Sequence, residues 1–354
     1  MSDYLVQYGG AERVLEVLCE IFPDAPIYTL IYDERATGGV FREKEIHTSF
    51  LQKLPLAKRH HRLFPALMPI AVEQFDLSYF DVVLSVSASF AKGIITKPHT
   101  KHINYCLTPT RFLWDDSHRY IDEFKLPWPI KRLIPFFITY LRIWDKEASL
   151  RVDKYVGISS FVRERIKKYY EQDSDLIYPP VKTGKYFISE NLGDYFLMVG
   201  RLVSYKRFEL AVKAFSAMGI PLKIAGDGPE RKRLEKITGG NIEFLGLVSD
   251  YRMPDIYSRA QALIFPQEED FGLVALESMA SGRPVIAYRG GGALETVVEG
   301  KTGIFFNDQS EIAISLAVGE YFKTKFDPEF IREHAKKFDV EVFKKKIVSL
   351  VANK

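Results

Sequence analysis

Cysteine is scarce in this chain of 354 residues, in which only Cys19 and Cys106 occur. Two cysteines are too few for disulfides to stabilise a chain of this length, so the fold must depend on its hydrophobic core. A reducing compartment is expected for the same reason. Long apolar runs are absent too, because the longest, residues 133–141, falls well short of the roughly 20 residues of a membrane span. Residues 1–10 have neither the basic nor the apolar region of a signal peptide. We therefore expect a cytoplasmic protein that is at most peripheral on the inner membrane face.

A surplus of positive charge is also lacking, since 49 Lys and Arg residues stand against 46 Asp and Glu residues, a formal net charge of +3. This balance argues against a nucleic-acid partner. Hydrophobic residues make up 47% and charged residues 27% of the chain, a mixture typical of globular proteins. At about 150 residues per domain, the length indicates two domains.

Short apolar runs alternate with segments of helical periodicity, most regularly in the second half of the chain. This alternation predicts βαβ units and parallel sheets in both halves. The expected strands are 27–32, 82–86, 102–107, 155–158, 195–199, 222–225, 242–245, 262–265, 284–287 and 303–306, and clear helices are expected at 11–21, 161–170, 209–217 and 273–281.

Residues 178–193 are rich in Pro, Gly and polar residues without periodicity, which is typical of a linker. We expect an N-terminal domain over 1–184, a C-terminal domain over 185–325, and C-terminal helices over 326–354 that pack back toward the N-terminal domain. The pair Gly9-Gly10 is preceded by residues 1–8 alone, too little for the apolar strand that normally feeds such a turn. Either the native start lies upstream, or the N-terminal domain lacks its first central strand, which is the expectation adopted here.

Ligands of open parallel sheets bind beyond the carboxyl ends of the strands, where charged side chains follow two of the expected strands. After the first, Arg201 and Lys206 either converge on one anionic group or form a solvated basic loop. After the second, an acidic turn with Glu269 leads into a helix that carries Glu277. Carboxylates beside the first amides of a helix suit a ligand with both sugar hydroxyls and phosphates. An acidic helix cap would explain Glu269 but not Glu277.

Glycine-rich turns occur at three further places. Gly9-Gly10 opens a helix, as a phosphate site or as a plain tight turn. The turn 226–229 lacks the third glycine of the dinucleotide fingerprint, which argues against a nicotinamide oxidoreductase. Helix capping alone explains the turn 289–295.

Three motifs of the second half, taken in this order and at this spacing, resemble the retaining glycosyltransferases of family 4, the group 1 class. They are Gly200-Arg201 with Lys206, the turn Gly226-Asp227-Gly228-Pro229, and Glu269 followed after seven residues by Glu277. The resemblance extends over residues 3–303. Segments 8–13 and 105–115 resemble the branch of mannosyltransferases that build surface polysaccharides and glycolipids. The resemblance implies a GT-B fold, with two Rossmann-like parallel-sheet domains facing a cleft.

The resemblance also implies a hexosyltransferase that moves a hexose, mannose from GDP-mannose, to a glycan or lipid-linked acceptor with retention of configuration. Arg201 and Lys206 would neutralise the donor pyrophosphate, Glu269 would bind the sugar hydroxyls, and Glu277 would hold the ribose. No metal and no cofactor are expected, because the two cations carry the charge. The remaining donor-binding residues would be Gly9, Gly10, Gly226, Asp227, Gly228, Phe271, Gly272, Leu273 and Val274.

Leu107 stands where many relatives carry a histidine that touches the donor sugar. Arg111 or His118 could supply that contact on the acceptor side, although a histidine in a polar stretch such as His118 is more often a plain surface residue. Leu107 and the missing strand motivate an alternative, a catalytically impaired nucleotide-sugar-binding protein. Residues 125–151 mix aromatic and basic side chains, which suits either a peripheral membrane contact or an ordinary packed helix.

Overall fold

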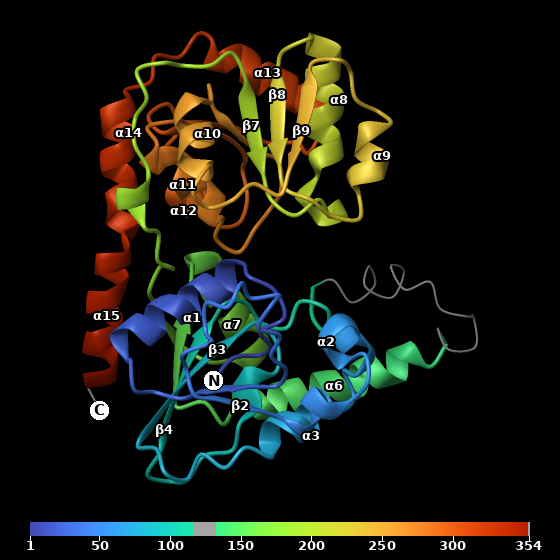
Figure 1. Cartoon of the computed structure of the whole chain (residues 1–354), viewed down its shortest axis with the longest axis vertical. Helices are drawn as coiled ribbons and strands as arrows, with labels where there is room; N and C mark the ends of the chain where they lie inside the picture. Colours follow the sequence, from blue (N-terminus) through green and yellow to red (C-terminus); the bar gives the residue numbers. More distant parts are fainter. Residues whose placement is uncertain (116–131, 353–354) are drawn as a thin grey trace. The chain divides into compact units, whose positions relative to one another are not determined.

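The computed structural model describes residues 1–115 and 132–352, and the chain divides into two compact units (Figure 1). Unit 1 comprises Met1–Tyr178 together with the residues from Phe343 onward, and unit 2 comprises Pro179–Val342. All strand pairings within each unit are parallel in the described part of the chain. Both units are Rossmann-like, which confirms the expected α/β fold class.

In its described residues, unit 1 has a two-stranded and a four-stranded sheet, in the orders β1-β2 and β3-β4-β5-β6. Each apolar run expected in this half contains a strand, and most residues of these strands are buried. The short strands β2 and β6 carry too few apolar residues to be expected from the sequence. The strands are β1 (Ile27–Thr29), β2 (Ile46–Thr48), β3 (Val82–Ser87), β4 (Lys101–Cys106), β5 (Lys154–Gly157) and β6 (Ser174–Leu176), and the helices are α1 (Gly10–Ile21), α2 (Ala57–His60), α3 (Met68–Glu73), α6 (Ile134–Ser149) and α7 (Ser160–Tyr170).

No strand precedes α1 in the described structure, as expected. Residues 1–5 instead lie between the two sheets of unit 1 and make single bridges. Ser2 bridges both Thr29 of β1 and Val86 of β3, and Leu5 bridges Tyr32. These bridges place the segment where the first central strand of a Rossmann-like domain would run, and they connect the two sheets.

The loop after β4, residues 107–115, is held by a buried ion pair. Lys92 and Asp145 have side chains that are 2% and 1% exposed, and Lys92 Nζ lies 2.5 Å from Asp145 Oδ1. The same carboxylate accepts hydrogen bonds from Thr110 Oγ1 at 2.6 Å and from Trp114 Nε1 and Tyr170 Oη at 2.9 Å. A buried charge with this many donors is fully compensated, so the loop is fixed to the body of unit 1.

Unit 2 has one six-stranded sheet in the order β12-β11-β10-β7-β8-β9. Helices α8 and α13 bury one apolar cluster with this sheet, and α11 packs against β10 and β11. The strands are β7 (Phe196–Val199), β8 (Leu222–Ala225), β9 (Ile242–Gly246), β10 (Leu263–Phe265), β11 (Val285–Tyr288) and β12 (Gly303–Phe306), and the helices are α8 (Phe208–Met218), α9 (Arg231–Glu235), α10 (Met253–Arg259), α11 (Leu273–Ala280), α12 (Ala293–Thr296), α13 (Glu311–Tyr321) and α14 (Pro328–Ala335). The last helix, α15 (Val340–Ala352), begins in unit 2 and continues in unit 1.

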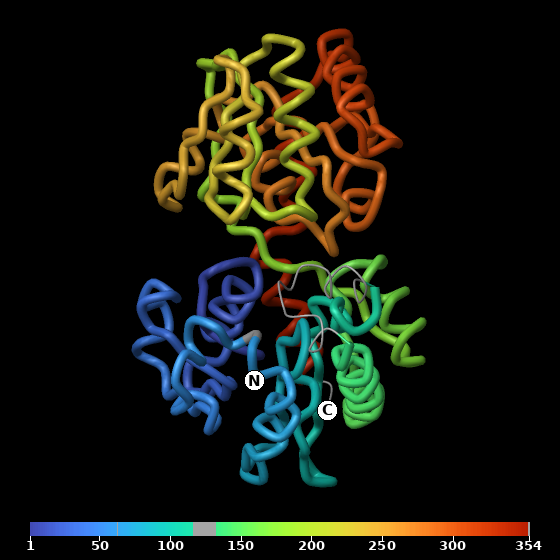
Figure 2. The backbone as a smooth tube through the Cα atoms, turned by 90° about the vertical axis from the view of Figure 1, so that its right-hand side faces the viewer, coloured from blue at the N-terminus to red at the C-terminus, as the bar shows by residue number. Residues whose placement is uncertain are grey.

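The unit boundaries differ from the expected domain limits of 184/185 and 325/326. The first lies at Tyr178/Pro179, and the last helices divide. Helix α14 stays with unit 2 because it packs against α11, whereas Phe343 of α15 packs edge-on against Tyr105 of unit 1, with 5.6 Å between ring centroids. The end of α15, in red in Figure 2, therefore belongs to unit 1. None of the helices in the described residues combines the length and apolar character needed to cross a membrane.

Candidate active site

The order of the strands in unit 2 reverses between β7 and β10. The chain proceeds from β7 to β8 and β9 on one side, then returns to pair β10 on the other side of β7. At such a reversal the loops after the two neighbouring strands separate and leave a crevice at their carboxyl ends, the usual ligand position in open α/β sheets. Here those loops are the turn that starts at Gly200 and the acidic turn 266–272.

An ion pair connects the two loops at this reversal. Lys206 Nζ lies 2.9 Å from Glu269 Oε1, and the two side chains are 14% and 19% exposed. Burial by itself lowers the pKa of Lys206, but the Glu269 carboxylate and other neighbouring groups outweigh burial and raise the pKa above its usual value. Lys206 is therefore a protonated, half-buried cation at the reversal point.

Glu277, one turn inside α11, also acts on this cation, since its charge raises the pKa of Lys206 as well. Its side chain is buried, and Tyr257 Oη of α10 donates a hydrogen bond of 2.7 Å to Glu277 Oε2. The structure thus brings Lys206, Glu269 and Glu277 together in one region of unit 2. Arg201, directly after Gly200, is exposed at the same strand end, and Lys206 turns to Glu269.

Two of the glycines predicted for donor binding, Gly226 and Gly228, lie where two backbone segments touch. A Cβ on Gly226 would collide with the carbonyl oxygen of Gly200, and the φ of Gly226 is +137°. A Cβ on Gly228 would collide with Leu202, whose amide donates to the carbonyl of Asp227 at 3.0 Å. These contacts hold the loops after β7 and β8 against each other, so the glycines shape the crevice.

The third glycine turn does more than cap a helix. Gly291 and Gly292 pack directly against the acidic turn, where a Cβ on either would collide with the backbone of Glu269 or Phe271, and Gly292 N donates to Glu269 O at 2.8 Å. Sequence analysis explained this turn by capping alone. The contact was missed because it joins loops after β10 and β11, which are adjacent only in the folded sheet.

Gln267 and Tyr257 were missed as well. Gln267 is 2% exposed; its Nε2 donates to Glu269 Oε1 at 3.1 Å, and its Oε1 has no hydrogen-bond partner in the described part of the chain. Both residues are recognised by their burial next to charged side chains. That burial is a property of the folded structure and cannot be predicted from a sequence pattern. Phe271 is buried, and Gly272 precedes α11 with a φ of +91°, which turns the acidic loop into the helix that begins with Leu273 and Val274.

The candidates of unit 1 have local partners. The amide of Gly9 donates to Glu12 Oε2 at 2.8 Å, and Gly10 begins α1, as in a capped helix start. Arg111 lies in the loop held by Asp145, and Leu107 donates its amide to Ser87 O at 2.8 Å. His118 lies outside the described residues.

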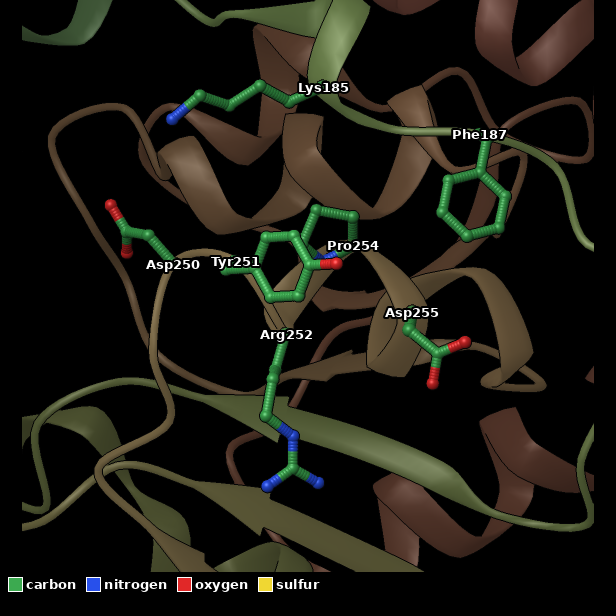
Figure 3. A pocket seen from close by; sticks show the side chains of 7 residues that line it. All are labelled: Lys185, Phe187, Asp250, Tyr251, Arg252, Pro254 and Asp255. Atoms are coloured by element: carbon green, nitrogen blue, oxygen red, sulfur yellow. The ribbon is translucent and has the colours of Figure 1, made fainter.

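A separate pocket of about 650 Å³ lies at the start of α10 (Figure 3). It lies between the segment after β6 and the loop that leads into α10, and none of the charged residues predicted for the donor lines it. Its lining residues are Lys185, Phe187, Asp250, Tyr251, Arg252, Pro254 and Asp255.

Comparison with known proteins agrees with this geometry. Residues 189–338, nearly all of unit 2, match the family model described as "Glycosyl transferases group 1". Unit 2 is therefore similar to the group 1 glycosyltransferases over nearly its whole length. An uncharacterized glycosyltransferase of Methanocaldococcus jannaschii is 30% identical over 212 residues, which cover 56% of this chain and 59% of that protein. A GDP-mannose-dependent alpha-(1-6)-phosphatidylinositol dimannoside mannosyltransferase of Mycobacterium tuberculosis is 37% identical over 127 residues, which cover 34% of this chain and 33% of that protein. The chain thus matches less than two thirds of the length of these curated relatives.

Solved structures match the whole chain at low identity. Anabaena HepE, in complex with UDP and glucose, aligns with a TM-score of 0.72 at 16% identity and covers 100% of this chain and 99% of its own. Sucrose-phosphate synthase from Thermosynechococcus elongatus aligns with a TM-score of 0.73 at 16% identity, covering 99% and 98%. At this identity the likeness shows the fold, which is GT-B. The part that matches the group 1 model is the second of the two Rossmann-like domains.

Proposed function

We propose that this protein is a retaining hexosyltransferase that transfers mannose from GDP-mannose to a glycan or lipid-linked acceptor. In this proposal the group 1 domain binds the nucleotide sugar at the reversal between β7 and β10. Lys206 and Arg201 neutralise the pyrophosphate, which is also the leaving group, and Glu269 binds hydroxyls of the hexose. The buried acceptor Gln267 Oε1 would take a hydrogen bond from the same sugar.

One observation carries the proposal: a protonated lysine and two carboxylates meet at the reversal point of the sheet. A pyrophosphate that leaves a sugar gains negative charge in the transition state, and a fixed cation stabilises that charge more strongly than the ground state. The carboxylates suit the hydroxyls of a hexose and a ribose, because ionised carboxylates are pure hydrogen-bond acceptors.

The choice of GDP-mannose rests on relatives. The mycobacterial relative is by name GDP-mannose-dependent and a mannosyltransferase, and its match spans 34% of this chain. Segments 8–13 and 105–115 resemble the same branch. The roles predicted for Gly9, Gly10 and Arg111 in unit 1 stay predictions, as does the absence of a metal requirement, for which Arg201 and Lys206 would substitute.

Calorimetric titration with GDP-mannose, UDP-glucose and free GDP tests the donor. We expect GDP and GDP-mannose to bind with EDTA present and UDP-glucose to bind at least tenfold more weakly. Transfer assays with a lipid extract as acceptor then test catalysis. Arg201→Ala and Lys206→Ala should each abolish turnover, whereas Lys213→Ala, on the exposed face of α8, should leave it intact. Near-normal rates in both site variants would contradict the proposal.

Helix α6 supports contact with a lipid-linked acceptor at a membrane surface. Phe136, Tyr140 and Ile143 are 75%, 55% and 61% exposed, and their spacing places them on one face of the helix. An exposed apolar stripe beside basic residues such as Arg132 suits a peripheral membrane contact. We expect cosedimentation with anionic liposomes that falls with added salt and is lost in Phe136→Ser/Ile143→Ser. Equal sedimentation of this variant and the wild type would remove α6 as the contact.

The alternative, a protein that binds a nucleotide sugar without turning it over, is motivated by Leu107. GDP binding without product from any acceptor, and without donor hydrolysis, would favour that alternative. A Leu107→His variant that gains turnover would identify the missing side chain as the cause.

A further inference from the structure

Helix α10 meets α11 through one buried hydrogen bond at the centre of the candidate site. Tyr257 is fully buried, and its hydroxyl donates to Glu277 Oε2 at 2.7 Å. Glu277 is itself 6% exposed. A buried hydrogen bond from a hydroxyl to a carboxylate is stronger than one between neutral groups, because the acceptor is charged and little water competes for it.

The neighbours of Tyr257 hold its ring in place, so the ring cannot move together with the Glu277 side chain. Tyr186 packs against it edge-on, with 5.8 Å between ring centroids and an interplanar angle of 77°. Arg283 Nε donates to the carbonyl of Ser258, the neighbour of Tyr257 in α10, at 2.7 Å, and Arg283 Nη2 donates to Ser189 O at 2.8 Å. The hydroxyl therefore stands at a fixed point, and it fixes the rotation of the Glu277 carboxylate.

We propose that Tyr257 is a positioning residue, which aims the Glu277 carboxylate at the ribose hydroxyls of the donor nucleotide. The inference rests on the proposed function, in which Glu277 holds the ribose. With one carboxylate oxygen held by Tyr257, the rotation of the Glu277 carboxylate is restricted before the donor arrives. Such preorganisation raises affinity, because the bound rotamer costs little entropy to select.

The sequence contains no sign of this role. Tyr257 and Glu277 are twenty positions apart, in two helices separated by β10 and the acidic turn. A tyrosine in a helix with Ile256 and Ala260 beside it is ordinary core material by pattern. The contact between α10 and α11 brings its hydroxyl to Glu277, the residue proposed to bind the ribose.

Calorimetric titration of the full chain with two pairs of probes tests the inference: GDP with 2′,3′-dideoxy-GDP, and UDP with 2′,3′-dideoxy-UDP. For the nucleotide that the wild type binds, Tyr257→Phe should raise Kd roughly tenfold, the loss of one well-oriented contact. For its dideoxy form, wild type and Tyr257→Phe should bind equally weakly, because no ribose hydroxyl remains for Glu277 to accept from.

Tyr195→Phe is the matched control. Tyr195 Oη donates to the carbonyl of Ile256 in the same helix at 2.8 Å, so this variant also removes one tyrosine hydroxyl that supports α10 but leaves Glu277 untouched. It should bind both forms like the wild type. Glu277→Gln provides a second route: in that background Tyr257→Phe should add less than a twofold further loss of affinity.

Each result decides the matter. Unchanged binding by Tyr257→Phe, or an equal loss for the ribose and dideoxy forms, would overturn the positioning role while leaving the nucleotide-binding function in place. A wild type that binds neither GDP nor UDP would overturn the proposed function, and the inference with it. A Tyr257→Phe chain that fails to fold transfers the test to Glu277→Gln, which should then discriminate less between the ribose and dideoxy forms than the wild type does.

Discussion

The ion pair between Lys206 and Glu269 makes a sharp prediction, because removing one partner or the other should change nucleotide binding in different ways. At 2.9 Å and an effective dielectric constant of about 20, two unit charges attract by about 6 kcal/mol. Desolvation offsets most of this attraction, and both side chains retain some exposure, so we expect a net coupling of about 2 kcal/mol in the ligand-free protein.

The same pair competes with a bound pyrophosphate for the lysine. Lys206→Ala removes the cation and leaves Glu269 beside the phosphates, so GDP should bind at least a hundredfold more weakly, about 3 kcal/mol. Glu269→Gln keeps the cation and removes its competitor, so GDP should bind as tightly as to the wild type or more tightly. Sugar transfer should nevertheless slow in Glu269→Gln, because the amide accepts hydroxyl hydrogen bonds less strongly than the carboxylate.

Calorimetry with GDP and urea unfolding of the ligand-free chain measure the two effects. The two single variants and the double variant form a cycle that isolates the coupling from the individual costs. If Glu269→Gln weakened GDP binding as much as Lys206→Ala, the two residues would serve only as a structural clamp between the loops, and the assignment of Lys206 to the pyrophosphate would be wrong.

Two further predictions concern stability. Burial lowers the pKa of His102 in β4 to about 3. Between that pKa and 6.5, the unfolded state therefore binds one more proton than the folded state. The free energy of unfolding of unit 1 should fall by about 2 kcal/mol as the pH falls from 8 to 5. The buried Asp3, whose pKa is raised chiefly by burial, acts in the opposite direction. The free energy of unfolding should therefore be measured against pH for His102→Gln and for the wild type, and the variant should show the shallower slope. Equal slopes would contradict the reasoning. Gly226→Ala should destabilise unit 2 by about 2 kcal/mol or more in thermal unfolding, because its Cβ would collide with the Gly200 carbonyl. The control Gly319→Ala, in an open position of α13, should be neutral or stabilising. An unchanged unfolding midpoint for Gly226→Ala would show that the loops after β7 and β8 can separate freely.

Local pattern was sufficient for most elements of the fold. Apolar runs at 222–225 and 303–306 became β8 and β12 with the same bounds, because a short run that is buried along most of its length has little alternative to a parallel strand. The strands β2 and β6 were not expected, since edge strands of three residues are held by their neighbours and hardly by their own composition. Residues 1–5 likewise carry no strand pattern, and the two flanking strands hold them in place through single bridges.

The sequence by itself determined which residues could form the candidate site: the charges and glycines that follow β7, β8 and β10, recognisable because strand ends and helix starts are local features. The tertiary structure alone decided their partners. That Lys206 turns to Glu269, that Glu277 is held by Tyr257, and that the Gly291-Gly292 turn supports the acidic loop all depend on the strand order of the sheet. Contacts between loops of neighbouring parallel strands join residues far apart in the chain, and one-dimensional periodicity contains no information about which strands become neighbours.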